Sequence, residues 1–527
     1  MSPGARDEAV DQPLDAPLDL RLAPALGAAW LGALVVVRVS ATTAGCAAVS
    51  CAVIAALVAA MGATRTDTRR AGAPRVGTAG ATRAGPTRAS AWGVAAFALL
   101  VAATTLAAGA AQVASRDSGP WHRLAGDRVV VEGRVAGDPV VLPPAWPGAP
   151  TRAMWMLTAE EVTTTGRTPH GQRARAPLQV LGPASAVPEF DARVRVRGRL
   201  DPEPSGRRAV ALLLTTDEPL VVGRPAAVHR VAHVVRASER ALAARLAGDP
   251  RALLPGVTVG DTTGVPDDLR AAMRSAGLTH LTAVSGAHFS LVAVLALALA
   301  SAARVPRRWR PAVVVVAMAA MVVLVHPSPS VVRAAAMGLV GVWGMLLGRP
   351  ARAPAALAAA VIVLLAADPW LAGELGFVLS VLATGAIVLV SGPLTRRWEP
   401  RCGRVLAAAL AVPVAAQLAC GPVVAAIAPS FSLYAIPANI LAAPAVAPAT
   451  VLGLAAGVVA PWCAPAAQAL AWGAGAACWW IGAVARLAAR APGATVAWLP
   501  GAAGVATLAL AGFCAARLLL GRSHRAR

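Results

Sequence analysis

The stretch "HLTAVSGAHFSLVAVLALALASA", His280–Ala302, indicates what class of protein this is. After His288 it is apolar apart from two serines and carries no acidic or basic side chain. A helix needs about 20 predominantly apolar residues to cross a bilayer, so the stretch predicts a transmembrane helix. The first half is more polar than lipid favours. Its polar side chains predict a helix start that faces protein or water.

The composition of the whole chain agrees with this interpretation. The 527 residues are 57% hydrophobic and 14% charged, and the mean hydropathy is +0.62. These values are typical of a polytopic membrane protein and exclude an ordinary soluble globule. The net charge of +22 comes entirely from arginine, because the chain has no lysine. Cytoplasmic loops attract arginine whatever the function, so the charge alone does not indicate a nucleic-acid partner.

The order of the segments predicts four regions, residues 1–117, 118–223, 224–276 and 277–527. The first contains about three transmembrane helices and an Arg-rich cytoplasmic loop over Gly62–Ser90. Under the positive-inside rule, the third helix then leaves residues 118–223 outside the cytoplasm. The last region contains a further series of apolar segments, in the style of a transporter or channel. The expected location is the cytoplasmic membrane, which the chain crosses many times.

Residues 118–223 alternate apolar and polar side chains between Gly- and Pro-rich turns. Five strand candidates appear in "RVVVEGRVAG", "AMWMLTAEEVTT", "PLQVLG", "ARVRVRGRL" and "AVALLLTTDEPLVVG". Five short strands in about a hundred residues fit a small barrel of OB type. The predicted fold is therefore a polytopic α-helical membrane protein with an inserted, extracytoplasmic, OB-like β-barrel domain.

One of these strands carries a regular row of arginines. Arg193, Arg195, Arg197 and Arg199 alternate with smaller residues, and the period of two places all four on one face. Such a face can follow a phosphate backbone. The alternative is a solvated outer face in an Arg-rich sequence, and the residues alone leave both open.

Residues 224–276 begin with a helix whose apolar positions recur at helical spacing. An amphipathic helix lying in the membrane interface is expected, followed by a loop. His229 and His233 lie four residues apart, but no third ligand accompanies them. No metal site is predicted.

Arg333 is the most unusual residue of the last region. It follows "PSPS" and lies two residues into an apolar segment. A charge at that depth is unfavourable and usually faces a cavity or a partner, for which Glu374 and Asp368 are candidates. Snorkelling to the interface is the alternative. Ser285 and His288 resemble a nucleophile and base, but no acidic residue is fixed beside them, so catalysis is not predicted. Packing between helices and lining of a pore both remain possible.

Several polar motifs occur in a fixed order along the chain. They are "LLPGVTVGD" from Leu253, "GLTHLTAVSGAHFSLV" from Gly277, "PSPSVVRAAAMG" from Pro327, "GELGFVLSVLATGA" from Gly373 and "PSFSLYAIPANILAAP" from Pro429. As a set they resemble the ComEC family of competence proteins, membrane channels for DNA uptake. One departure is Val378, which stands where the family commonly has Gln. The resemblance implies import of single-stranded DNA across the cytoplasmic membrane, with the external domain near the entrance.

The family's motif positions imply a set of residues that line the path or gate for DNA. They are His280, Ser285, Gly286, His288, Ser330, Arg333, Ser380 and Asn439. The external DNA-binding face would be Arg193, Arg195, Arg197 and Arg199. No catalytic residue, metal or cofactor is expected.

The partners expected are single-stranded DNA and the lipid bilayer, with a separate DNA receptor, nuclease and cytoplasmic motor. The separate nuclease is expected because the family's metallo-β-lactamase-like domain and its HxHxDH cluster do not appear. The separate motor is expected because no Walker motif is present. The alternatives are a transporter of another anionic solute on the same scaffold, or a non-functional relic of the channel.

Overall fold

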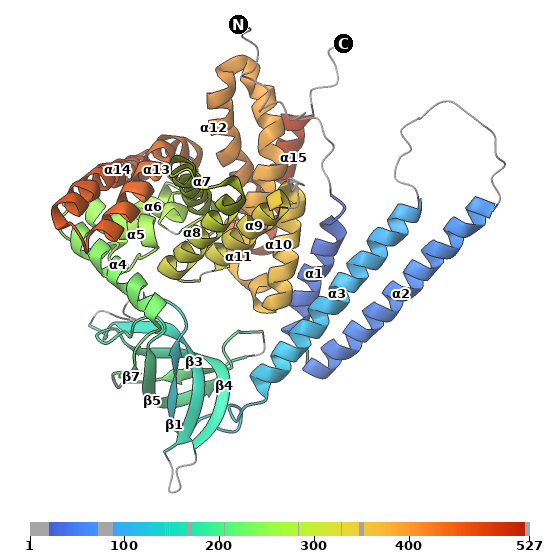
Figure 1. Cartoon of the computed structure of the whole chain (residues 1–527), viewed down its shortest axis with the longest axis horizontal. Helices are drawn as coiled ribbons and strands as arrows, with labels where there is room; N and C mark the ends of the chain where they lie inside the picture. Colours follow the sequence, from blue (N-terminus) through green and yellow to red (C-terminus); the bar gives the residue numbers. More distant parts are fainter. Residues whose placement is uncertain are drawn as a thin grey trace.

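The computed structural model describes residues 20–71, 88–142, 144, 146, 148–165, 171–204, 206–282, 284–327, 329–346 and 353–521. Figure 1 shows a helical bundle, a β-sheet domain below it, and a long helical hairpin beside both. The protein is thus a polytopic helical protein with a β-sheet domain. Seven helical segments of the described chain are long and apolar enough to cross a membrane.

The N-terminal part consists of α1 (Ala23–Val36), α2 (Ala41–Ala71) and α3 (Arg88–Asp117). Helices α2 and α3 form the hairpin, while α1 lies between α3 and the bundle (Figure 1). Small residues allow α1 and α3 to pack closely, because a Cβ at Gly109 would lie 2.6 Å from Val36. The Arg-rich loop predicted over Gly62–Ser90 is shorter than expected, since α2 continues to Ala71 and α3 begins at Arg88. The remainder of that predicted loop lies outside the described residues.

The β-sheet domain contains seven strands in one sheet. They are β1 (Arg128–Val135), β2 (Val140–Leu142), β3 (Arg152–Thr164), β4 (Gly171–Pro183), β5 (Arg193–Pro202), β6 (Ala211–Leu214) and β7 (Leu220–Gly223). The pairings run from β1 to β3, β4, β6 and β5, and β5 pairs again with β1. Only the β4–β6 pair is parallel within this ring.

Alternation along the strands explains the core of this domain. Val194 and Val196 point inward and are buried, together with Trp155, Leu157 and Leu178 from neighbouring strands. The sequence prediction was incomplete in two respects. It missed the short strand β2, and its fifth strand is two strands, β6 and β7, separated by a turn.

The segment after the sheet differs from the prediction of one interfacial helix and a loop. It contains α4 (Ala227–Ala243), α5 (Asp249–Val259) and α6 (Asp267–Ser275). Leu253 and Leu254 in the predicted loop are fully buried in α5, and Pro255 is accommodated inside that helix. In α4 the exposed side carries valines, whereas Arg236 and Glu239 point inward and are buried. The interfacial position of α4 remains a prediction.

The buried carboxyl of Glu239 lies between α4, α5 and α13. Thr258 Oγ1 donates to its Oε2 at 3.0 Å, while its Oε1 has no hydrogen-bond partner among the residues that the structure describes. The side chain fits because α13 presents Gly457, where a Cβ would lie 2.8 Å from Oε1. Burial raises the pKa of Glu239 to about 8, although the Thr258 hydrogen bond opposes this effect.

We expect Glu239 to make the stability of the protein depend on pH. Between pH 4.5 and about 8 the folded state retains a proton that the unfolded state loses, so stability falls as pH rises through this window. The Glu239→Gln variant should lose this part of the pH dependence, and the exposed Glu374→Gln should retain it. Thermal unfolding of the purified protein between pH 5 and pH 9 measures both. Identical pH profiles for wild type and Glu239→Gln would contradict the assignment.

The remaining helices form the bundle. They are α7 (Gly286–Ala302), α8 (Arg310–Val325), α9 (Pro329–Leu346), α10 (Ala353–Ala367), α11 (Leu375–Ala386), α12 (Gly392–Ile427), α13 (Ala435–Val459), α14 (Ala464–Arg490) and α15 (Gly501–Leu520). Short helical turns η1 (Thr279–Leu281), η2 (Arg307–Trp309), η3 (Pro369–Gly373) and η4 (Ile387–Ser391) join or extend them. Strands β8 (Ser430–Ser432) and β9 (Thr495–Ala497) form a small second sheet.

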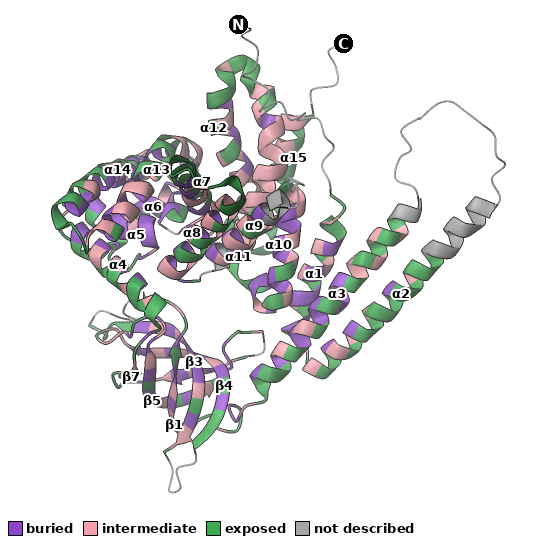
Figure 2. Ribbon diagram, viewed as in Figure 1, coloured by how far each residue is buried: buried purple, intermediate pink, exposed green. Residues whose placement is uncertain are grey.

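The long helices differ in how well they fit a membrane-spanning position. Much of the outer surface of α2 and α15 is exposed in Figure 2, and it carries apolar side chains, as a lipid-facing surface does. Gly403 interrupts α12 with a φ of 77°. Helix α14 is not among the seven candidate segments and packs along α13 and α5.

Candidate functional site

Arg333 is buried inside the bundle, at 4% exposure, on the second turn of α9. Its Nε donates to Ser380 Oγ at 2.8 Å, and its Nη1 donates to Thr384 Oγ1 at 3.1 Å. Both hydroxyls belong to α11, one helical turn apart. The Met337 sulfur lies 3.0 Å from Nη1 and adds a weak acceptor.

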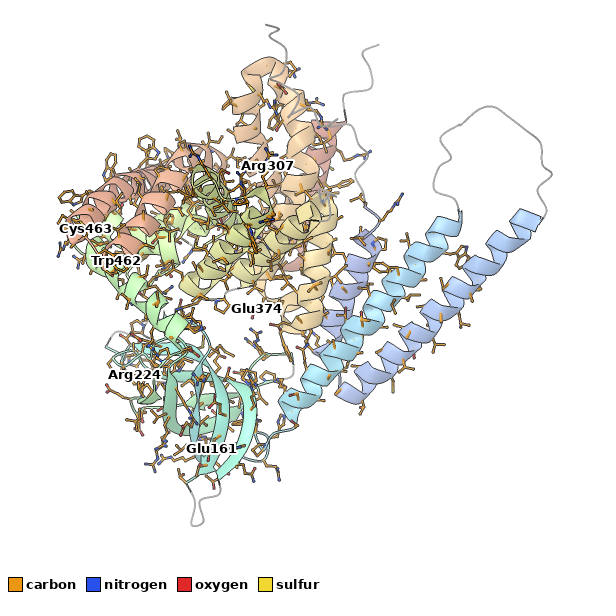
Figure 3. All side chains as sticks on the ribbon, viewed as in Figure 1. Glu161, Arg224, Arg307, Glu374, Trp462 and Cys463 are labelled. Atoms are coloured by element: carbon orange, nitrogen blue, oxygen red, sulfur yellow. The ribbon has the colours of Figure 1, made fainter. Side chains whose placement is uncertain are left out.

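The acidic partners suggested for Arg333 are not found. Asp368 pairs with Arg208 from the sheet domain, and Glu374 is exposed at the N-cap position of α11. Figure 3 places Glu374 on the side of the bundle that faces the sheet. No carboxylate of the described chain lies within ion-pair distance of Arg333, whose described acceptors are all neutral. Snorkelling is also inconsistent with its burial.

The start of α7 lies directly against this guanidinium. Gly286 is the first residue of the helix, and a Cβ there would lie 3.4 Å from Arg333 Nη2. The first backbone N–H groups of a helix carry a partial positive charge and favour anions. Arg333 therefore adds a full positive charge beside a helix N-terminus. An anion, such as a phosphate, is the ligand that this combination favours.

Ser285 and His288 form a helix cap. The Ser285 backbone N–H donates to His288 Nδ1 at 3.0 Å, and Ser285 Oγ lies 3.0 Å from the same nitrogen. His288 Nδ1 is thus the acceptor, and its buried Nε2 has no hydrogen-bond partner among the described residues. A nucleophile–base pair needs an acidic group to orient the far nitrogen, and no described carboxylate does so here. The polar start of the helix, noted in the sequence, is explained by this cap.

Two other predicted path residues, His280 and Asn439, make no hydrogen bond to this cluster among the described residues. His280 lies in η1, near enough to His288 for the charges of the two rings to interact. Ser330 is in the first turn of α9, and its side chain lies outside the described residues. Asn439 donates to Ala435 O at 2.8 Å and to Gly277 O at 3.4 Å, which ties α13 to the turn before η1. The contacts described above bring together Ser285, Gly286, His288, Arg333 and Ser380.

Thr384 was missed by the sequence prediction. Its signal is its spacing of four residues from Ser380, which places both hydroxyls on one face of α11. That spacing identifies an acceptor pair only when the position of Arg333 is known.

The arginine row on β5 has the predicted alternation but is largely paired. Arg193 binds Glu132 at 3.0 Å and Glu160 at 3.3 Å, and Arg195 binds Glu132 at 3.1 Å. Arg199 binds Asp201 at 3.2 Å, which leaves Arg197 as the arginine of this row without an acidic partner among the described residues. Each pair lowers the positive potential of the face. A role of this arginine row in binding DNA remains a prediction.

A second polar cluster joins the sheet domain to the bundle. Arg236 of α4 donates to Asp138 Oδ2 at 3.1 Å and to the carbonyls of Val259 and Leu324. His326, after α8, binds Asp138 Oδ1 through Nδ1 at 2.7 Å. Burial tends to raise the pKa of Asp138, but the His326 hydrogen bond and the Arg236 charge together hold it below its usual value.

Aromatic contacts reinforce this joint. Phe190 of the sheet domain stacks on His326 with ring centroids 4.2 Å apart. His233 Nε2 lies 2.9 Å from the carbonyl of Phe190, and His229 meets the edge of the same ring. The two histidines of α4 thus pack against the sheet domain, and no metal-type cluster forms in the described chain.

Comparison with known proteins identifies the family. A family model described as "Competence protein" matches residues 257–523, which is half of the chain and includes Arg333 and the start of α7. The chain belongs to the competence protein family. The chain is also similar to "ComE operon protein 3" of Bacillus subtilis (strain 168), 28% identical over 196 residues. The match covers 37% of this chain and 25% of the relative, so the chain spans about a quarter of that relative's length. No solved structure matches.

Proposed function

We propose that this protein is a membrane channel that imports single-stranded DNA across the cytoplasmic membrane during natural transformation. The observation that carries the proposal is Arg333, buried beside the start of α7 with no acidic partner in the part of the chain that the structure describes. A polyanion cannot cross hydrocarbon and needs a path that attracts phosphates but also releases them. A lone guanidinium held by neutral hydroxyls offers one such contact. Membership of the competence family supports DNA as the cargo and uptake, not catalysis, as the role.

The ring of strand pairings supports an OB-like identity for the sheet domain. Without the short strands β2 and β7, the ring has five strands, which in chain order are β1, β3, β4, β5 and β6. Their pairing order is first, second, third, fifth, fourth and back to the first. Five-stranded barrels of OB type are closed in this way and bind oligonucleotides. We place this domain on the outer side of the membrane. Arg307, in an Arg-rich turn, lies on the opposite side of the bundle from Glu161 of the sheet (Figure 3), as the positive-inside rule favours.

The proposed partners are the incoming strand, the bilayer, and separate receptor, nuclease and motor proteins. The path residues are those of the Arg333 cluster, with His280, Ser330 and Asn439 as further candidates. The arginine row on β5 is a further candidate contact for the strand outside the membrane.

The test is uptake of fluorescent DNA into competent cells with and without the gene for this protein. Added nuclease removes surface-bound DNA, so the protected fraction measures import. We expect deletion to remove the protected signal and the wild-type gene to restore it. Unchanged protected DNA after deletion, in cells shown to be competent, would contradict the channel and favour the solute-transporter or relic alternative.

A further inference from the structure

An open cavity of about 390 Å³ lies where the sheet domain meets the helices. Strand β4, the end of α3 and the turn η3 form its walls, and Figure 1 shows β4 beside the end of α3. Its polar and aromatic lining consists mainly of Gln112, Arg116, Arg175, Arg208, Asp368 and Trp370. Three of these side chains are arginines, and they have different environments.

Arg116 supports the cavity, and each of its three guanidinium nitrogens already donates to a protein acceptor. Its guanidinium binds Asp117 at 2.7 Å and the carbonyls of Arg208 and Ala209 at 3.4 and 2.9 Å. These bonds fix the connection between β5 and β6 against α3. Arg208 is thereby held at the edge of the cavity, where it pairs with Asp368 of the helical part.

Arg175 is the arginine of the cavity whose charge is not paired with a described residue. It lies on β4, is exposed, and has no hydrogen bond or ion pair to any described residue. Neighbouring Ala174 and Ala176 are buried, so the strand alternation directs Arg175 outward. Asp368 partly neutralises Arg208. The cavity therefore keeps a net positive charge, in contrast to the largely paired face of β5.

We propose that this cavity binds one backbone phosphate of the DNA strand between Arg175 and Arg208, where the strand passes from the sheet domain to the bundle. The inference rests on the proposed function and names a binding site for its substrate. In OB-type barrels the second and third strands and the loop between the fourth and fifth strands hold oligonucleotides, and here these are β3, β4 and the segment that carries Arg208. Asp368 competes with the phosphate for Arg208. This competition keeps the phosphate loosely bound, as passage requires.

Binding of a fluorescent oligo-dT 12-mer to the full chain in phosphatidylcholine nanodiscs tests this site. We expect Arg175→Ala to raise Kd by about 5- to 10-fold at low salt and to reduce the slope of log K against log salt by about one. Arg175→Lys should recover part of the affinity. Asp368→Asn should lower Kd, because it frees Arg208 without removing a hydrogen-bonding side chain. The matched control is Arg245→Ala, which removes an exposed arginine that does not line the cavity.

Equal Kd values for Arg175→Ala and Arg245→Ala would overturn the site, as would weaker binding by Asp368→Asn with an unchanged melting temperature. A phospholipid headgroup has the same phosphodiester chemistry. If phosphatidylglycerol discs weaken oligonucleotide binding and abolish its dependence on Arg175, the occupant is lipid and the proposal fails. Uptake in cells separates this proposal from the channel itself. If deletion of the gene abolishes uptake but the cavity variants bind DNA normally, the cavity site is contradicted and the channel proposal stands.

Discussion

Arg333→Ala is expected to lower protected DNA uptake by about 10- to 100-fold, the loss that removing one charged hydrogen-bonding contact with phosphate predicts. The stability of the protein should not fall. Among the described residues Arg333 is buried against neutral acceptors, so its charge is desolvated without the compensation of an acidic partner. Its removal relieves that desolvation and leaves Ser380 and Thr384, whose hydroxyl protons can find backbone acceptors. Thr384 already donates to Ser380 O at 2.8 Å.

This combination separates a functional arginine from a structural one. A structural arginine loses stability and uptake together, whereas Arg333→Ala should lose uptake alone. The measurements are protected uptake in cells and thermal unfolding of the purified variant. Arg307→Ala, an exposed arginine of the bundle, is the control and should retain uptake (Figure 3). Normal uptake by the Arg333→Ala variant would contradict a role for Arg333 in the path of the DNA.

The second large effect is expected at the joint between the sheet domain and the bundle. Arg236→Ala leaves Asp138 without its cation and leaves the carbonyls of Val259 and Leu324 without a donor. Breaking a buried pair on one side is strongly destabilising. Because Asp138 itself is 38% exposed, we expect about 2–3 kcal/mol, at the lower end of such losses.

Thermal unfolding and limited proteolysis measure this loss. The variant should unfold at a lower temperature and be cleaved faster between β7 and α4 than the wild type. Arg230→Ala on the same helix is the matched control, since Arg230 is exposed and binds only the nearby carbonyl of Pro225. If Arg236→Ala and Arg230→Ala unfold at the same temperature, the joint does not hold the two parts together.

The element types were largely predictable because they depend on local pattern. The stretch His280–Ala302 is long and apolar enough to predict a helix in lipid. The alternation around Val194 and Val196 predicts a strand with one buried face. Prediction failed where one local signal was misleading. Pro255, Gly256 and Gly260 resemble a loop, yet α5 buries Leu253 and Leu254 so completely that packing outweighs the proline.

The sequence by itself determined the membrane class, the strand-rich insert and the unusual position of Arg333 in an apolar segment, since each depends on hydropathy, period or the scarcity of charge. Only the tertiary structure decided which charges are free. Strand register places Glu132 opposite Arg195, and the domain arrangement gives Asp368 to Arg208 and not to Arg333. These partners are far apart in the chain. The Coulomb interaction between them depends on distance and burial, which sequence spacing does not specify.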